Sequence, residues 1–242
     1  MPATTALAGT SRTTTVPAAI VGLIFAAAGN GTWLSFLIGM LGLVLVSHNI
    51  NQFSRRSASA GSLYSFIVKG LGPTTGVLGG WALLFGYTLT GMSTLCGFTA
   101  IAREFLEPLG VHLPVILVYA LVAGAAFIFA YKEATLSARA MLLFEGAAIA
   151  SVLALGYLIW RHSGFEVDMR QLRLEGTTPG GILMGVVLVV FAFSGFESST
   201  SLGEEARNPL RSIPRSVLHS VIVAGCVFIF MAYVVIIGFK GL

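Results

Sequence analysis

The sequence predicts an all-α integral membrane protein, on the basis of its composition and its hydrophobic pattern. Of the 242 residues, 56% are hydrophobic and only 10% are charged, whereas a soluble domain carries about 25% charged residues. The apolar residues form long runs, unlike the alternation at every second residue of a membrane β-barrel. A formal net charge of +4 would suggest nucleic acid in a soluble protein. Here the basic residues lie in short loops between apolar runs, so membrane lipid is the expected partner, and nucleic acid is not.

Seven segments are expected to cross the bilayer, because each crossing needs about 20 apolar residues. Two of them have short apolar parts, residues 16–29 and 182–193, which would be about 21 and 18 Å long as helices. Each is therefore extended through its polar neighbours. The expected helices cover residues 8–29, 32–50, 76–102, 113–131, 140–160, 182–202 and 217–239, all in a single membrane domain of residues 1–242.

The first segment contains a cluster of hydroxyl residues, Thr13, Thr14 and Thr15, followed by Pro17. One interpretation is a discontinuous helix, because short, interrupted segments in corresponding positions of two halves indicate a transporter binding site. The other places the threonines at the level of the lipid headgroups, with Arg12 reaching the cytoplasm. Both interpretations remain open.

The loop after the second segment contains an amphipathic stretch, at about residues 60–70. Leu63, Phe66, Ile67 and Gly70 share one helical face, which favours a short helix at the membrane interface over an extension of the third crossing. Lysine and arginine are more frequent on the side that holds this loop. The positive-inside rule therefore predicts a multi-pass protein of the cell membrane with a cytoplasmic N-terminus.

The sixth segment carries an acid within its expected crossing. Residues 182–202 would form a helix of about 31 Å, which places Glu197 inside the membrane, where a charged group is costly and indicates function. Ser194 and Gly195 favour a helix break, and backbone exposed at a break is tolerated only where it lines a cavity. We expect a small zwitterion at this break, with its ammonium beside Glu197. The alternatives are a continuous helix with Glu197 paired to a neighbouring helix, and a position of Glu197 at the cytoplasmic interface.

A second intramembrane acid, Glu145, lies early in the fifth segment. It is a candidate proton carrier, but a polar contact between helices is the favoured interpretation. The four histidines lie near segment ends without a metal-binding spacing, and the two cysteines form no redox motif. We therefore expect no enzyme activity, no cofactor and no metal.

Two stretches resemble a known family. The stretch FAFSGFESSTSLGEEARNPLRSIPRSV, residues 191–217, resembles the sixth helix and following loop of amino acid–polyamine–organocation (APC) superfamily permeases. The stretch RRSASAGSLYSFIVKGLGPTTGVLGGWALLFGY, residues 55–87, looks like the second-to-third loop and third helix of the same family. The two stretches occur in the family's order.

The resemblance implies alternating access in a fold of two inverted five-helix repeats, with discontinuous helices one and six. One phenylalanine of helix six would act as an aromatic gate. The candidates for ion coupling, Glu145 and Glu197, follow instead from their positions as acids within the membrane. The substrate-binding residues implied by the resemblance are Phe193, Ser194, Gly195, Phe196, Glu197, Tyr87, Thr13, Thr14 and Thr15.

The sequence departs from the family pattern in three ways. GTSRTTTVP stands where helix one usually has a Gly-x-Gly break, helix five offers Glu145 and no lysine, and the chain ends after the seventh of about twelve helices. The prediction is the N-terminal portion, helices one to seven, of a secondary transporter for amino acids or related amines, with proton coupling or exchange. The alternative is a membrane fragment, or a binding or assembly protein, that does not transport.

Overall fold

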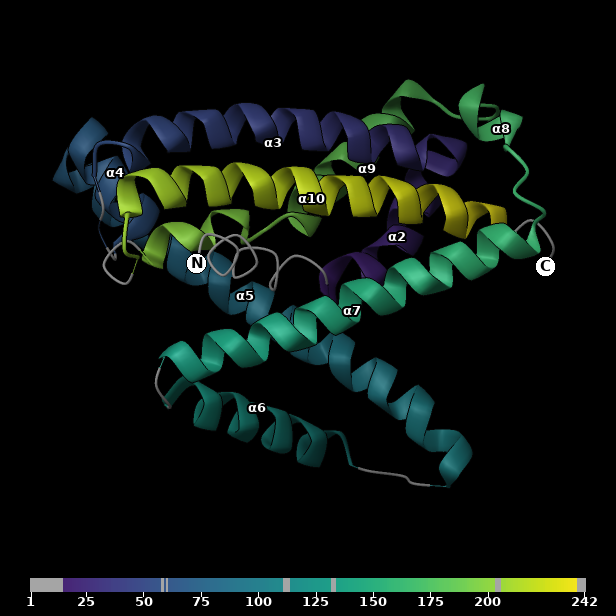
Figure 1. The fold of residues 1–242 in the computed structure, drawn as a ribbon, viewed down its shortest axis with the longest axis horizontal. Coiled ribbons are helices and arrows are strands. Elements are labelled where there is room, and N and C mark those ends of the chain that lie inside the picture. Colours follow the sequence, from purple (N-terminus) through teal and green to yellow (C-terminus); the bar gives the residue numbers. More distant parts are fainter. Residues whose placement is uncertain are drawn as a thin grey trace.

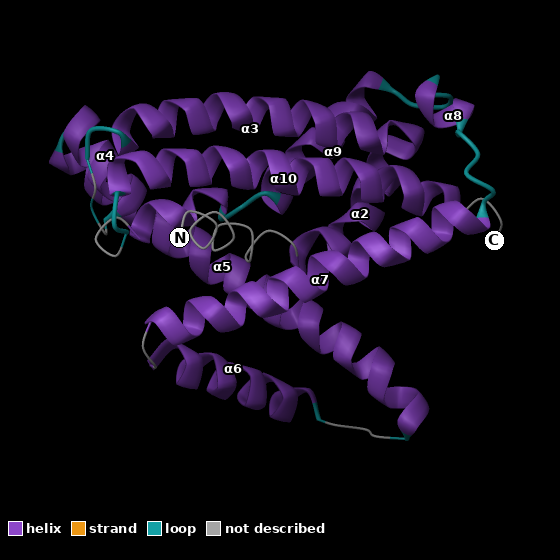
Figure 2. Ribbon diagram, in the orientation of Figure 1, coloured by secondary structure: helices purple, strands orange, loops and turns teal. Residues whose placement is uncertain are grey.

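The computed structural model of the protein describes residues 15–57, 59, 61–110, 114–131, 134–202 and 206–238. This part of the chain is helical, with turns and short loops and without strands (Figure 2). The predicted all-α class is confirmed. Helices suit a lipid environment because each one satisfies its own backbone N–H and C=O groups.

The packed part of the molecule consists of α2 (Thr15–Ala28), α3 (Thr32–Ser54), α9 (Pro179–Ala192) and α10 (Pro209–Gly238). α3 and α10 lie side by side and run in opposite directions (Figure 1), and α9 packs against both α2 and α3. The short turn η1 (Gly29–Gly31) joins α2 to α3. These helices bury most of the apolar core.

The remaining long helices are α5 (Pro73–Leu106), α6 (Val115–Tyr131) and α7 (Ala134–His162), which diverge from the packed part in Figure 1. Their apolar side chains are largely exposed, as Phe105 (76%) and Ile116 (81%) illustrate. An apolar surface of this extent suits contact with membrane hydrocarbon. Two short elements follow α5 and α7, namely η2 (Glu107–Leu109) and α8 (Met169–Leu172).

Five stretches of the described chain are long and apolar enough to cross a membrane: Ile20–Ser54, Pro73–Arg103, Leu142–His162, Pro179–Leu202 and Pro209–Gly238. The first stretch combines most of α2 with the whole of α3. Its 35 residues would measure about 52 Å as one straight helix, far more than the roughly 30 Å of a bilayer core. The chain instead turns at η1, where Gly29 has a φ of +53°. α6 is a shorter apolar helix, and the expected count of seven crossings stays a prediction.

The loop after α3 forms the separate helix α4 (Ser62–Leu71). Gly72 ends it with a φ of +91°, in the left-handed region that favours glycine, so α4 is not a continuation of α5. α4 packs against α5 and against the segment that follows α9. Its position at the membrane interface stays a prediction.

Candidate functional site

The helix break at the end of α9 organises the candidate site. α9 begins at an N-cap, Thr178, whose hydroxyl accepts from the Gly181 N–H at 3.1 Å, and Pro179 follows at the first helical position, where no N–H is needed. The helix ends at Ala192. Gly195 then has a φ of +100°, which an L side chain rarely adopts. The break predicted at Ser194 and Gly195 is present.

The chain continues as η3 (Phe196–Leu202), a 3₁₀ helix. The Ser198 N–H donates to the Gly195 carbonyl at 3.0 Å, and the Thr200 and Ser201 hydroxyls donate to carbonyls three residues earlier, each at 2.7 Å. These contacts satisfy backbone groups that a broken helix leaves unpaired.

Glu197 lies at the start of η3, with only 8% of its surface exposed. Its Oε1 accepts a hydrogen bond of 3.0 Å from the Tyr87 hydroxyl of α5. The family resemblance predicts both residues near one site, and the structure brings them into direct contact across 110 residues of sequence. This contact connects the broken segment to a helix outside the packed part.

A cavity of about 280 Å³ opens beside this contact. Its polar wall consists of Ser194, Glu197 and Tyr87, and its remaining wall is apolar or carries no side chain. The latter is made by Ile67 of α4 and by Gly79, Ala82, Leu83 and Gly86 of α5. The volume lies near the lower limit of about 300 Å³ for ligand pockets, so the space suits one small molecule.

Two further contacts hold η3 in place. The Ser62 hydroxyl of α4 hydrogen-bonds the Thr200 hydroxyl, and the Ser220 hydroxyl of α10 donates to the Phe196 carbonyl at 3.4 Å. Both serines are buried. The segment that carries Glu197 is therefore supported from α4, α5 and α10, and a supported carboxylate keeps its orientation toward the cavity.

The two phenylalanines of the break lie away from this cavity. Phe193 is completely buried and contacts the Phe228 ring, with centroids 5.1 Å apart, and Phe196 also belongs to the hydrophobic core. Neither lines the cavity. Gly195 supplies the turn between them.

Other predicted site residues lie elsewhere or outside the described part. Thr13 and Thr14 are outside the described residues, and Thr15 is the first residue of α2, with its side chain not described. Glu145 is buried within α7 and is not part of the cavity wall.

The α5 wall of the cavity was not predicted from the sequence. Gly79, Ala82, Leu83 and Gly86 are spaced three, four and seven residues apart, which places them on one helical face. That spacing was visible in the sequence. Which partner the face meets depends on tertiary packing.

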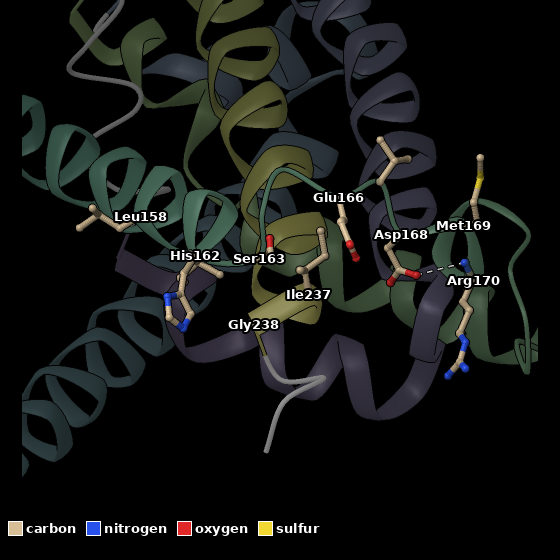
Figure 3. A pocket seen from close by; sticks show the side chains of 11 residues that line it. Leu158, His162, Ser163, Glu166, Asp168, Met169, Arg170, Ile237 and Gly238 are labelled. Carbon is tan, nitrogen blue, oxygen red and sulfur yellow. Dashed lines mark hydrogen bonds between the residues drawn. The ribbon is translucent and has the colours of Figure 1, made fainter.

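A larger cavity, of about 970 Å³, lies at the far end of α10 from η3. Its lining comes from the end of α7, the loop before α8, the start of α8 and the end of α10 (Figure 3). Asp168 is engaged locally, because one carboxylate oxygen accepts from the Arg170 N–H at 3.1 Å and the other from the Gln171 amide at 2.9 Å. Glu166 is exposed. The larger cavity is favoured by its volume alone. The smaller cavity contains the buried acid, Glu197, and burial strengthens the attraction between a carboxylate and an ammonium. We therefore assign the candidate site to the smaller cavity.

The chain is similar to known transport proteins. It is 26% identical to the branched-chain amino acid permease BcaP of Bacillus subtilis, over 84% of this chain and 46% of the relative. It is 24% identical to the low-affinity putrescine importer PlaP of Escherichia coli, over 82% of this chain and 44% of the relative. It is 25% identical to human cationic amino acid transporter 4, over 86% of this chain and 35% of the relative. The chain thus spans less than half the length of these relatives, and no solved structure matches it significantly.

The family model described as amino acid permease matches residues 7–241, almost the whole chain. With the apolar helices of the structure, this match identifies a multi-pass membrane protein. The chain belongs to the amino acid permease family.

Proposed function

We propose that the protein transports an amino acid or a related amine across the cell membrane by secondary active transport with alternating access. The observation that carries this proposal is Glu197, a buried acid that lines a small cavity at a helix break. An acid at such a position in a membrane helix is costly and by default indicates a site for an ion or a substrate. Family membership supports the same conclusion.

Glu197 would bind the ammonium group of the substrate through charge attraction and hydrogen bonds. A carboxylate and an ammonium attract each other more strongly in a poorly hydrated cavity than in water. Tyr87 occupies one carboxylate oxygen and would hold the group in orientation. Ser194, also in the wall, offers a hydroxyl to the same end of the substrate.

The opposite wall favours an aliphatic substrate body over a second charge. Ile67, Ala82 and Leu83 present hydrocarbon to the cavity, and its described lining contains no acid besides Glu197 that could bind a second ammonium. The relatives include one named for branched-chain amino acids and one named for putrescine. A diamine would place its second ammonium against hydrocarbon, which is unfavourable. The second charge of an amino acid, its carboxylate, would instead lie next to its ammonium, where N–H groups of the broken backbone can receive it. An aliphatic amino acid is therefore the preferred substrate.

The charge distribution supports a cytoplasmic N-terminus. Six exposed basic residues lie at the α4 end of the packed helices: Arg55, Arg56, Lys69, Arg207, Arg211 and Arg215. The opposite end mixes both signs, with Glu166 and Glu175 beside arginines. By the positive-inside rule the α4 end faces the cytoplasm.

Glu197 and Glu145 remain the candidates for proton coupling.

The test is uptake of labelled leucine and labelled putrescine into proteoliposomes containing the purified protein, with binding to the same preparation measured in parallel. Leucine uptake above that of empty liposomes supports the proposal. Binding without uptake would favour the alternative, a membrane protein that binds its ligand without transporting it. Neither binding nor uptake of either compound would contradict both.

A further inference from the structure

Gly86 marks the part of the cavity wall where α5 leaves open space. A Cβ added at Gly86 would meet no atom within 4 Å. A Cβ at Gly79 would lie 2.6 Å from the Ile67 side chain, which closes that part of the wall. Both glycines line the cavity, but only the one at position 86 leaves room for a ligand atom.

The direction of the missing side chain follows from helix geometry. Seven residues turn an α-helix by almost two full turns, so a Cβ at Gly86 would point in nearly the same direction as one at Gly79. The direction at Gly79 leads to Ile67, a lining residue of the cavity. Position 86 lies about 10 Å further along the axis, next to Tyr87. The free space therefore adjoins the Tyr87–Glu197 contact.

We propose that Gly86 sets the upper size limit of the aliphatic side chain that this site accepts. The inference rests on the proposed function, because it takes Glu197 as the group that binds the substrate ammonium. With the ammonium fixed there, the substrate side chain extends along the apolar wall and occupies the space beside Gly86. A methyl group at this position would compete with a large substrate side chain and leave a small one unaffected.

Replacing a glycine of α5 by alanine also has a general effect on helix stability, because glycine within a helix is unfavourable relative to alanine. α5 also carries Gly91, where an added Cβ would likewise meet no atom within 4 Å, but Gly91 does not line the cavity. It is five residues from Gly86 and hence on a different helical face. Gly91→Ala is therefore a matched control for the general effect of replacing an exposed glycine of this helix.

The experiment compares glycine with leucine as competitors for binding and uptake in proteoliposomes. Gly86→Ala should weaken leucine binding by about tenfold or more, the effect of one misplaced methylene in an apolar pocket, and change glycine binding by less than about threefold. Gly91→Ala should alter neither. Thermal unfolding confirms that each variant is folded, and Gly86→Ser provides a second substitution of similar size.

The outcomes separate this inference from the function on which it rests. If the unmodified protein binds neither glycine nor leucine, the preference for an aliphatic amino acid is wrong, and the size limit is wrong with it; the proposed function itself is wrong if putrescine does not bind either. If it binds both, and Gly86→Ala weakens both equally or weakens neither, only the role of Gly86 is wrong. Selective loss of leucine binding in Gly86→Ala, and not in Gly91→Ala, supports the inference.

Discussion

The hydrogen bond between Tyr87 and Glu197 is expected to contribute measurably to stability. It is the contact that joins α5 to η3 at the cavity. The test is a double-mutant cycle of Tyr87→Phe and Glu197→Met. Phenylalanine keeps the ring and removes the donor. Methionine keeps an unbranched side chain and removes the acceptor, which glutamine would retain.

The magnitude follows from the geometry. The O–O distance of 3.0 Å is at the long end of the range for O–H···O bonds, about 2.5–3.0 Å. Hydrogen bonds to charged groups contribute about 1.5–3 kcal/mol in soluble proteins, whereas side-chain hydrogen bonds in a membrane protein averaged about 0.6 kcal/mol. We therefore expect a coupling energy of about 1 kcal/mol, between these two values.

The assay is reversible unfolding in mixed micelles by titration with a denaturing detergent, for the unmodified protein, both single variants and the double variant. Tyr64→Phe serves as a control, since Tyr64 is 41% exposed on α4. A coupling energy within about 0.3 kcal/mol of zero, the usual limit of additivity, would refute the assignment of this contact as a structural link.

Two further predictions concern the helix break. Phe193→Ala should destabilise the protein by about 3–5 kcal/mol, since the ring is fully buried, whereas Phe191→Ala, at a side chain 43% exposed, should cost much less in the same unfolding assay. Equal effects would contradict the placement of Phe193 in the core. Gly195→Ala should destabilise by about 1–2 kcal/mol, because alanine is strained at a φ of +100°. An unchanged unfolding midpoint would show that the break is not fixed as described.

The sequence was informative where the hydrophobic pattern was strong. Long apolar runs predicted the helical segments, and the length of residues 182–202 showed that Glu197 lies within the sixth one. Ser194 and Gly195 indicated the break, because glycine alone tolerates the φ that the turn requires. Tyr87 was linked to Glu197 through the family resemblance, and the structure shows the two in contact.

The apolar wall of the cavity was not predictable from sequence. Helical periodicity is lost at a break, so the direction in which Phe193 and Phe196 face could not be predicted. Both pack into the core. The small residues of α5 form one face by their spacing, but only tertiary packing brings Gly86 to Glu197. The second half of the broken helix adopts a 3₁₀ form, which depends on local hydroxyl contacts more than on hydrophobic pattern.

The most direct test of the central claim is the concentration dependence of leucine uptake in Glu197→Gln, compared with Glu166→Gln. Glutamine keeps the shape of the side chain and removes its charge, and Glu166 lines the larger cavity. Loss of a charged contact of about 1.5–3 kcal/mol predicts a fall of about 10- to 150-fold in uptake efficiency for Glu197→Gln. Glu166→Gln should leave uptake unchanged. Unchanged uptake in Glu197→Gln, or a greater loss in Glu166→Gln, would contradict the assignment of the substrate site to Glu197.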